Sequence, residues 1–172
     1  TQPKAIKITE DREQFSKLAQ KLKLTQPDNG AATSAKAAHE IADQLGYPLM
    51  IRPSFVLGGR AMEVLHHPQD LTQTLEQFEK WPQAYPLLID RFLDNALEID
   101  VDAVYDGSDL LIGGIQTHIE QAGVHSGDSA CILPAQSLPP HIEQQLIKQL
   151  KDIAQAINIV GLLNAQFALQ GN

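Results

Sequence analysis

Three strand-like segments follow one another closely in the middle of the chain, and they constrain the fold more than any other feature of the sequence. They are residues 86–92, 97–105 and 109–119. Asp106-Gly107-Ser108, between the last two, has the composition of a hairpin turn. Because connections this short join antiparallel strands, the sequence predicts an antiparallel sheet in this region.

Helical patterns lie on both sides of these strands. Apolar residues recur at helical spacing in residues 11–23, 35–45, 68–80 and 142–157. Thr33 or Ser34 can cap the second helix, Gly46 can end it, and Pro68 suits the first turn of the third. Shorter strands are predicted at 47–52, 61–65 and 161–169, loops at 54–60 and 120–137, and a linker-like turn at 26–33.

Composition excludes several classes of protein. The 172 residues carry 13 Lys+Arg against 21 Asp+Glu, a formal charge of −8, so we expect no nucleic-acid partner, and any bound anion must meet a local site. No apolar run approaches the roughly 20 residues that span a bilayer, so we expect no membrane association. Cys131 is the single cysteine, and the apolar pattern of the first residues leads us to expect no secretory signal. We therefore expect a reducing, cytoplasmic location.

The end of the sequence resembles an interrupted hairpin. The predicted strand 161–169 is followed by Gln170-Gly171-Asn172, a turn-like ending without a second strand. We therefore expect the chain to be a fragment of a longer protein.

Arg52 follows a short buried strand and precedes a loop that contains Gly58 and Gly59. A fixed guanidinium beside a glycine loop can hold phosphate oxygens together with backbone N–H groups. The alternative is an arginine paired with a surface carboxylate beside an ordinary hairpin, and spacing alone leaves both interpretations open.

Glu98, Asp100 and Asp102 alternate with apolar residues, so on a strand the three carboxylates share one face. That face is either a solvated sheet surface or part of a cleft that recognises ribose hydroxyls or a metal. The spacing does not decide between them.

The loop from His118 to Cys131 is the densest in functional groups. Ser126 beside His125 and Asp128 lacks the arrangement of a hydrolytic triad. Helical ligand spacing is missing for a metal site at His118 and His125, so positioning or hydrogen bonding is the expected role of both. Cys131 is expected to be a small buried apolar residue.

Three longer motifs identify a family. They are Tyr47-Pro-Leu-Met-Ile-Arg-Pro-Ser-Phe-Val-Leu-Gly-Gly-Arg-Ala-Met-Glu63, Leu87-Leu-Ile-Asp-Arg-Phe-Leu-Asp-Asn-Ala-Leu-Glu-Ile-Asp-Val-Asp102 and Gly113-Gly-Ile-Gln-Thr-His-Ile-Glu-Gln-Ala-Gly-Val-His-Ser-Gly-Asp-Ser129. In order and spacing they resemble the large subunit of carbamoyl phosphate synthetase, an ATP-grasp enzyme. The stretches 58–63 and 125–129 resemble its carboxy-terminal half, which phosphorylates carbamate.

The resemblance implies an α+β, ATP-grasp fold. It further implies one partial ATP-grasp domain over 1–172, with a small lid subdomain at about residues 25 to 90, an incomplete antiparallel-sheet subdomain at about 91 to 172, and ATP between them. In the family, the strand after Asn172 supplies further metal ligands, so the resemblance implies that this fragment alone is inactive although the intact protein is a ligase.

The resemblance also implies a set of ATP-binding residues: Arg12, Arg52, Gly58, Gly59, Arg91, Leu93, Glu98, Gly123, Val124, His125, Ser126 and Gln166. Arg52 would contact phosphates and Glu98 the ribose hydroxyls. Arg91 and Leu93 would form the hinge beside the adenine; Arg91 stands where some members have His, a change that a backbone contact tolerates. Gln166 would bind the catalytic Mg²⁺ or Mn²⁺, and no residue is expected to act as a nucleophile.

The implied partners are ATP, carbamate, the rest of the large subunit and a glutaminase small subunit, in the synthesis of arginine and pyrimidines. Two alternatives stay open. The chain is a nucleotide-binding but catalytically inactive module, or it is another ATP-grasp carboxylate ligase such as a biotin carboxylase-like domain.

Overall fold

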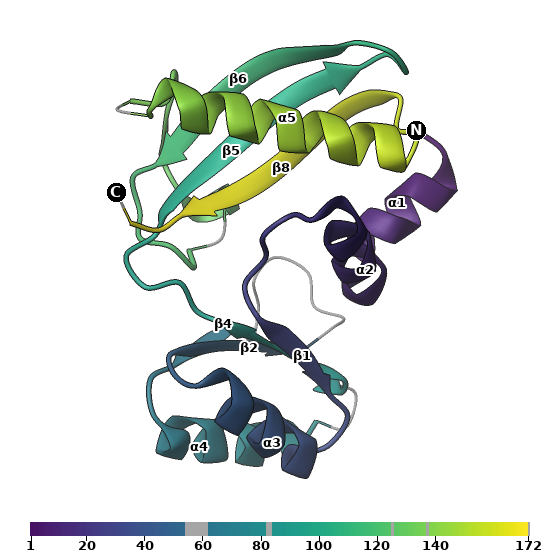
Figure 1. Cartoon of the computed structure of the whole chain (residues 1–172). Helices are drawn as coiled ribbons and strands as arrows, with labels where there is room; N and C mark the ends of the chain where they lie inside the picture. Colours follow the sequence, from purple (N-terminus) through teal and green to yellow (C-terminus); the bar gives the residue numbers. More distant parts are fainter. Residues whose placement is uncertain (54–61, 82–83, 125, 137, 172) are drawn as a thin grey trace. The chain divides into compact units, whose positions relative to one another are not determined.

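The computed structural model describes the chain except residues 54–61, 82–83, 125, 137 and 172 and the side chains of Arg12, Glu13, Glu79 and Ser126. The chain forms two compact units (Figure 1). Unit 1 comprises Thr1–Gln26, Ala96–Ala122 and Ser129–Asn172, and unit 2 comprises Pro27–Asn95 and Gly123–Asp128.

Unit 2 contains a four-stranded antiparallel sheet in the order β1-β4-β2-β3. Its elements are β1 (Asn29–Ala32), α3 (Ala35–Leu45), β2 (Leu49–Pro53), β3 (Glu63–Leu65), α4 (Pro68–Glu79) and β4 (Leu87–Arg91). Both helices lie on one side of the sheet (Figure 1), and they bury the alternate apolar residues of its strands, including Ile51 and Ile89. The opposite face is thereby left to Met50, Arg52 and Asp90.

Side-chain caps fix where the two helices of unit 2 begin. Ser34 Oγ accepts a hydrogen bond from the Ala37 N–H at 3.2 Å, which confirms the predicted cap of α3. At α4, Asp70 Oδ2 accepts from the backbone N–H groups of His67 and His66 at 2.8 and 2.9 Å. These two hydrogen bonds lower the pKa of Asp70.

Unit 1 contains a second antiparallel sheet in the order β7-β6-β5-β8. Its elements are α1 (Pro3–Glu10), α2 (Arg12–Leu22), β5 (Leu97–Tyr105), β6 (Leu110–His118), β7 (Cys131–Ile132), α5 (Pro140–Ala156) and β8 (Gly161–Leu169). Figure 1 shows α5 running across one face of this sheet, where Leu146 and Leu150 pack with Ile99 and Val101. A second cluster joins α1, α2 and the end of α5 around Ala5 and Ala154.

A β-bulge interrupts the pairing of β5 with β6. Ala103 lies opposite Ile112, but Asp102 lies opposite Gly114, so Gly113 is the additional residue. Because a shift of one residue exchanges the two faces of a strand, the bulge decides which side chains of β6 accompany the β5 carboxylates. It places Gln116 opposite Asp100, on the face away from α5.

The predicted helices and strands are confirmed, with ends that differ by a few residues, and so is the hairpin turn, where Asp106 Oδ1 accepts from the Ser108 and Asp109 N–H groups. The prediction of a linker over 26–33 was wrong, since β1 lies there, and α1 and β7 were not predicted. Cys131 is exposed rather than buried, because β7 is a two-residue strand at the sheet edge. Among the described helices, none is sufficiently long and apolar to cross a membrane.

Candidate functional site

The polar face of the unit 1 sheet carries the three predicted carboxylates. Glu98, Asp100 and Asp102 all lie opposite the α5 side, while Ile99, Val101 and Ala103 belong to the core, which confirms the alternation read from the sequence. The side chains of Glu98 and Asp100 are only 14% and 7% exposed. The interpretation as a fully solvated face therefore holds only for Asp102, which is exposed.

His118, at the end of β6, joins two of these carboxylates. Its Nε2 lies 2.6 Å from Asp100 Oδ2, in a hydrogen bond, and its Nδ1 lies 3.2 Å from Glu98 Oε2, close but without hydrogen-bond alignment. The imidazole side chain is fully buried. His118 therefore has the hydrogen-bonding role expected from the sequence. Two carboxylates of β5 lie beside its one imidazole ring.

Amide side chains of β8 and β6 complete this face. Gln166 Nε2 donates to Glu98 Oε2 at 3.2 Å, and Asn164 Nδ2 donates to Asp102 Oδ1 at 2.9 Å. Gln116 Nε2 donates to Asp102 Oδ2 at 3.2 Å. The predicted pair Glu98 and Gln166 thus lies in direct contact, although the two residues are 68 positions apart.

In unit 2, Arg52 lies on the sheet face that α3 and α4 do not cover. Its Nη2 is 3.9 Å from Oδ2 of Asp90 on the neighbouring strand β4. Asp90 is 7% exposed, so this carboxylate belongs to the interior rather than to the surface. The partner limits the freedom of the guanidinium, whose side chain remains one-third exposed.

The hinge predicted at Arg91 and Leu93 follows β4 directly. The Arg91 N–H donates to the Asp28 carbonyl at 2.8 Å, its guanidinium donates to the Leu45 carbonyl, and the Phe92 N–H donates to the Pro48 carbonyl at 3.0 Å. The Arg91 side chain is therefore occupied by the end of α3.

Gly123 lies against this hinge within unit 2. With φ of +97°, a Cβ at this position would lie 2.8 Å from the Phe92 ring and 3.1 Å from the Met50 methyl group, so glycine is required. Leu93 is half-buried, and Val124 is 38% exposed. The structure thus brings the predicted stretch at 123–124 beside the predicted hinge.

Several predicted residues lie outside the part that the structure describes. Gly58, Gly59 and His125 are outside it entirely. Arg12 is the first residue of α2, and Ser126 begins the short 3-10 helix Ser126–Asp128, but their side chains are not among those described. Sequence reasoning did not find Asp90 as the neighbour of Arg52 or the two carboxylates at His118; the Gly113-Gly114 pair was the available signal of a bulge that places His118.

Solved structures with low sequence identity share this fold. Biotin carboxylase from Campylobacter jejuni, in a complex with β-γ-ATP, matches 97% of this chain over 39% of its own length, with a TM-score of 0.79 and 19% identity. A second match is the biotin carboxylase domain of Hydrogenobacter thermophilus 2-oxoglutarate carboxylase, solved with MgADP, ADP and bicarbonate. It matches 98% of this chain over 39% of its own length, with a TM-score of 0.80 and 17% identity. The fold is that of the ATP-grasp class.

Sequence comparison gives the family within this class. Residues 11–172 match the family model described as carbamoyl-phosphate synthase L chain, ATP binding domain, and the chain belongs to this family. The carbamoyl phosphate synthase large chain of Methanospirillum hungatei is 49% identical over all 172 residues, which span 16% of that protein. The C-terminal section of the large chain of Methanocaldococcus jannaschii is 49% identical over 170 residues, or 28% of its length.

Proposed function

We propose that this chain binds ATP and that, in a longer protein, it contributes to the phosphorylation of carbamate. The observation that supports this most directly is the cluster at Glu98. This acidic side chain, in a chain of an ATP-binding-domain family, accepts a hydrogen bond from Gln166 and lies 3.2 Å from His118 Nδ1. The match to a separate C-terminal section supports assignment to the carboxy-terminal half of the large chain. The glutaminase partner, the cytoplasmic location and the role in arginine and pyrimidine synthesis belong to the same proposal.

The chemistry of each proposed residue determines which group of the nucleotide it would contact. In unit 2, Arg52 binds phosphate oxygens through charge-assisted hydrogen bonds, and the backbone of Arg91 and Leu93 contacts the adenine. Gly58, Gly59, Gly123, Val124, His125 and Ser126 extend the set in unit 2, and Arg12 belongs to the set in unit 1. In unit 1, Glu98 accepts hydrogen bonds from the ribose hydroxyls, since an ionised carboxylate is an acceptor only. Asp90 lies beside Arg52, and Gln166 donates a hydrogen bond to Glu98.

The amide oxygen of Gln166 on β8 suits Mg²⁺ or Mn²⁺, because hard divalent cations take oxygen ligands. The Gln166 amide nitrogen donates to Glu98 Oε2, which leaves the amide oxygen as the possible metal ligand. Gln166 would hold the metal through its amide oxygen. When bound, the metal would neutralise charge on the phosphate oxygens.

The proposed reaction requires no covalent bond between the substrates and a side chain of the protein. A carbamate oxygen attacks the γ-phosphorus, the bond to the β-γ bridging oxygen breaks, and carbamoyl phosphate and ADP result. Phosphoryl transfer of this kind depends on positioning and on charge stabilisation, which Arg52 and backbone N–H groups can provide. No side chain of this chain is required as a nucleophile.

Replacing Arg52 with alanine is expected to weaken ATP binding by about 10- to 150-fold, because a charge-assisted contact contributes about 1.5 to 3 kcal/mol. Isothermal titration calorimetry of the chain with ATP measures this. Lys36→Ala is the matched control, since Lys36 is an exposed cation on α3 of the same unit. Equal affinities of the two variants, or no ATP binding by the parent chain, would contradict the proposal.

Replacing Glu98 with glutamine is expected to reduce the preference for ATP over 2′-deoxy-ATP by about tenfold, since the carboxylate no longer accepts from the 2′-hydroxyl. Competition titrations with the two nucleotides measure the ratio. Asp102→Asn serves as the control, because Asp102 lies on the same face but is exposed and held by Asn164 and Gln116. If Glu98→Gln keeps the parent ratio, another group recognises the ribose.

A further inference from the structure

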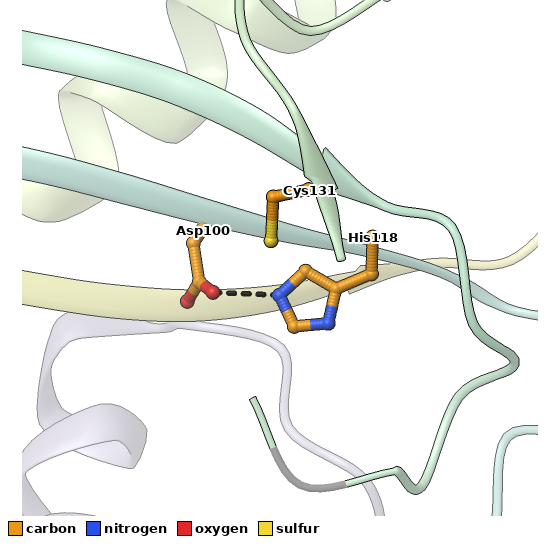
Figure 2. A group of neighbouring side chains, drawn as sticks. All are labelled: Asp100, His118 and Cys131. Atoms are coloured by element: carbon orange, nitrogen blue, oxygen red, sulfur yellow. Dashed lines mark hydrogen bonds and ion pairs between the residues drawn. The ribbon is translucent and has the colours of Figure 1, made fainter. Parts of the chain in front are cut away.

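A third side chain joins Asp100 and His118 on the polar face of the unit 1 sheet. The Sγ atom of Cys131 and the ligand atoms of Asp100 and His118 all lie within 4.8 Å of one another. Figure 2 shows the thiol pointing toward the carboxylate and the imidazole ring. Nitrogen, oxygen and sulfur donors that converge in this way can close around one cation.

Strand pairing fixes the three positions. Asp100 lies in the central strand β5, His118 ends β6, and Cys131 begins β7 directly opposite His118 in the ladder. Directly opposite residues of antiparallel strands place their side chains on the same face. The donors are therefore presented by a paired sheet rather than by a loop, so little ordering is needed when a cation binds.

We propose that Asp100, His118 and Cys131 form a binding site for a thiolate-preferring divalent cation of the Zn²⁺ type. One thiolate, one imidazole and one carboxylate are a usual ligand mixture for Zn²⁺, and a water molecule can take the fourth tetrahedral position. Mg²⁺ is disfavoured because it takes oxygen ligands. This site is separate in its ligands from the proposed Mg²⁺ ligand Gln166, and it does not depend on nucleotide binding.

Metal binding at this site releases one proton, from the thiol of Cys131. The thiol proton of Cys131 leaves to solvent as the thiolate binds the metal. His118 is neutral when it binds through Nε2, so its ring proton lies on Nδ1, and Asp100 binds through the oxygen that had faced Nε2. Nδ1 lies 3.2 Å from Glu98 Oε2, so a small ring rotation lets it donate there. A carboxylate that accepts from the second nitrogen is the usual support of a zinc-bound histidine.

Local charge favours a cation over a catalytic thiolate. Partial desolvation, followed by the Asp100, Glu120 and Asp102 carboxylates, raises the pKa of the Cys131 thiol. A nucleophilic cysteine has the opposite environment, in which neighbouring cations lower the thiol pKa. The same carboxylates attract a divalent cation, so Cys131 is suited to metal binding rather than to nucleophilic attack.

Cobalt provides a spectroscopic test in the metal-free chain, with a phosphine as reductant. Co²⁺ is expected to bind with one equivalent, to give a thiolate-to-metal charge-transfer band in the near ultraviolet, and to be displaced by Zn²⁺. Cys131→Ser should abolish the band and weaken Zn²⁺ binding by about 100-fold, at or above the largest loss typical of outer-shell changes. Asp100→Asn should weaken binding in the same direction.

The matched control is the double variant His66→Asn, His67→Asn. These exposed neighbours, with ring centroids 6.5 Å apart, are the most obvious competing surface site for Co²⁺. The band and affinity of this variant should equal those of the parent. A parent chain without the band, or Cys131→Ser with parental Zn²⁺ affinity, would overturn the proposal. Because Cys131 is exposed, its serine variant is expected to fold, and circular dichroism verifies this.

Alkylation gives a second readout that needs no spectroscopic metal. Cys131 is the single cysteine of the chain, so iodoacetamide reports on this thiol alone. Zn²⁺ should slow its alkylation at least about tenfold, because the thiolate is the reactive form and the metal occupies it. Mg²⁺ at the same concentration should leave the rate unchanged. Equal rates with and without Zn²⁺ would count against the site.

Discussion

Replacing His118 with alanine is expected to lower the stability of unit 1 by about 1 to 3 kcal/mol, the cost typical of leaving a buried hydrogen-bonding group without its partner. The imidazole is fully buried and makes a 2.6 Å hydrogen bond to Asp100, whose side chain is 7% exposed. Alanine would leave a carboxylate in the interior without this donor. Removal of the ring would also leave a cavity, which adds a packing cost.

Each unit offers its own reporter for this measurement. Amide hydrogen exchange in β5 and β6 follows unit 1, while the fluorescence of Trp81, the single tryptophan, follows unit 2. His118→Ala should accelerate exchange in the two strands and leave the urea transition of Trp81 unchanged. His141→Ala, at an exposed position of α5, is the control. A loss below about 1 kcal/mol would mean that water replaces the imidazole at little cost.

Inserting one alanine directly after Gly113 is expected to unfold unit 1. Gly113 is already the extra residue of the bulge, so the inserted residue would move every later residue of β6 one position along β5. Asp100 would then lie opposite Ile115 instead of Gln116. Because one residue of slip exchanges the faces, Gln116 and His118 would turn toward the α5 core and Ile115 toward the polar face.

The control for this insertion is Gly113→Ala. A Cβ at this position meets the Asp102 carbonyl at 3.4 Å, an ordinary contact, so the bulge can persist with alanine. Circular dichroism and amide exchange should show a folded unit 1 for Gly113→Ala and exchange without protection in β5 and β6 for the insertion. If the insertion variant retains native protection, β6 accommodates two extra residues and the bulge does not set the register.

The bulge also explains why only part of the polar face could be predicted from the sequence. Glu98, Asp100 and Asp102 depend only on alternation within one strand, which is a property of local geometry. The position of His118 depends on the register between two strands, and counting back from the turn at 106–108 gives the wrong face unless the extra residue is included. The Gly113-Gly114 pair was compatible with a bulge, but its position is set by pairing rather than by propensity.

Other differences have similar tertiary causes. Residues 29–32 contain no β-branched or aromatic residue, and they form a strand because Asn29 to Ala32 pair with β4 and because Gly30 permits close packing of Ile41. β7 has two residues and forms only where Thr117 and His118 provide an edge. The nucleotide roles of the individual residues came from resemblance to a family and stay predictions.

The division of the chain into units has a consequence for its synthesis. Unit 2 consists mainly of one continuous stretch, Pro27–Asn95, whereas unit 1 is assembled from three separate segments. On a ribosome, residues 1–26 emerge before unit 2, but α1 and α2 pack with Ile153, Ala154 and Ile157, which are synthesised after it. β5 likewise pairs with β8, which is synthesised more than 50 residues later. Since domains fold as units during translation, the segment Pro27–Asn95 should be native while the three segments of unit 1 are still unstructured. A nascent chain stalled after residue 130 should therefore protect the amides of β2 and β4 but not those of β5.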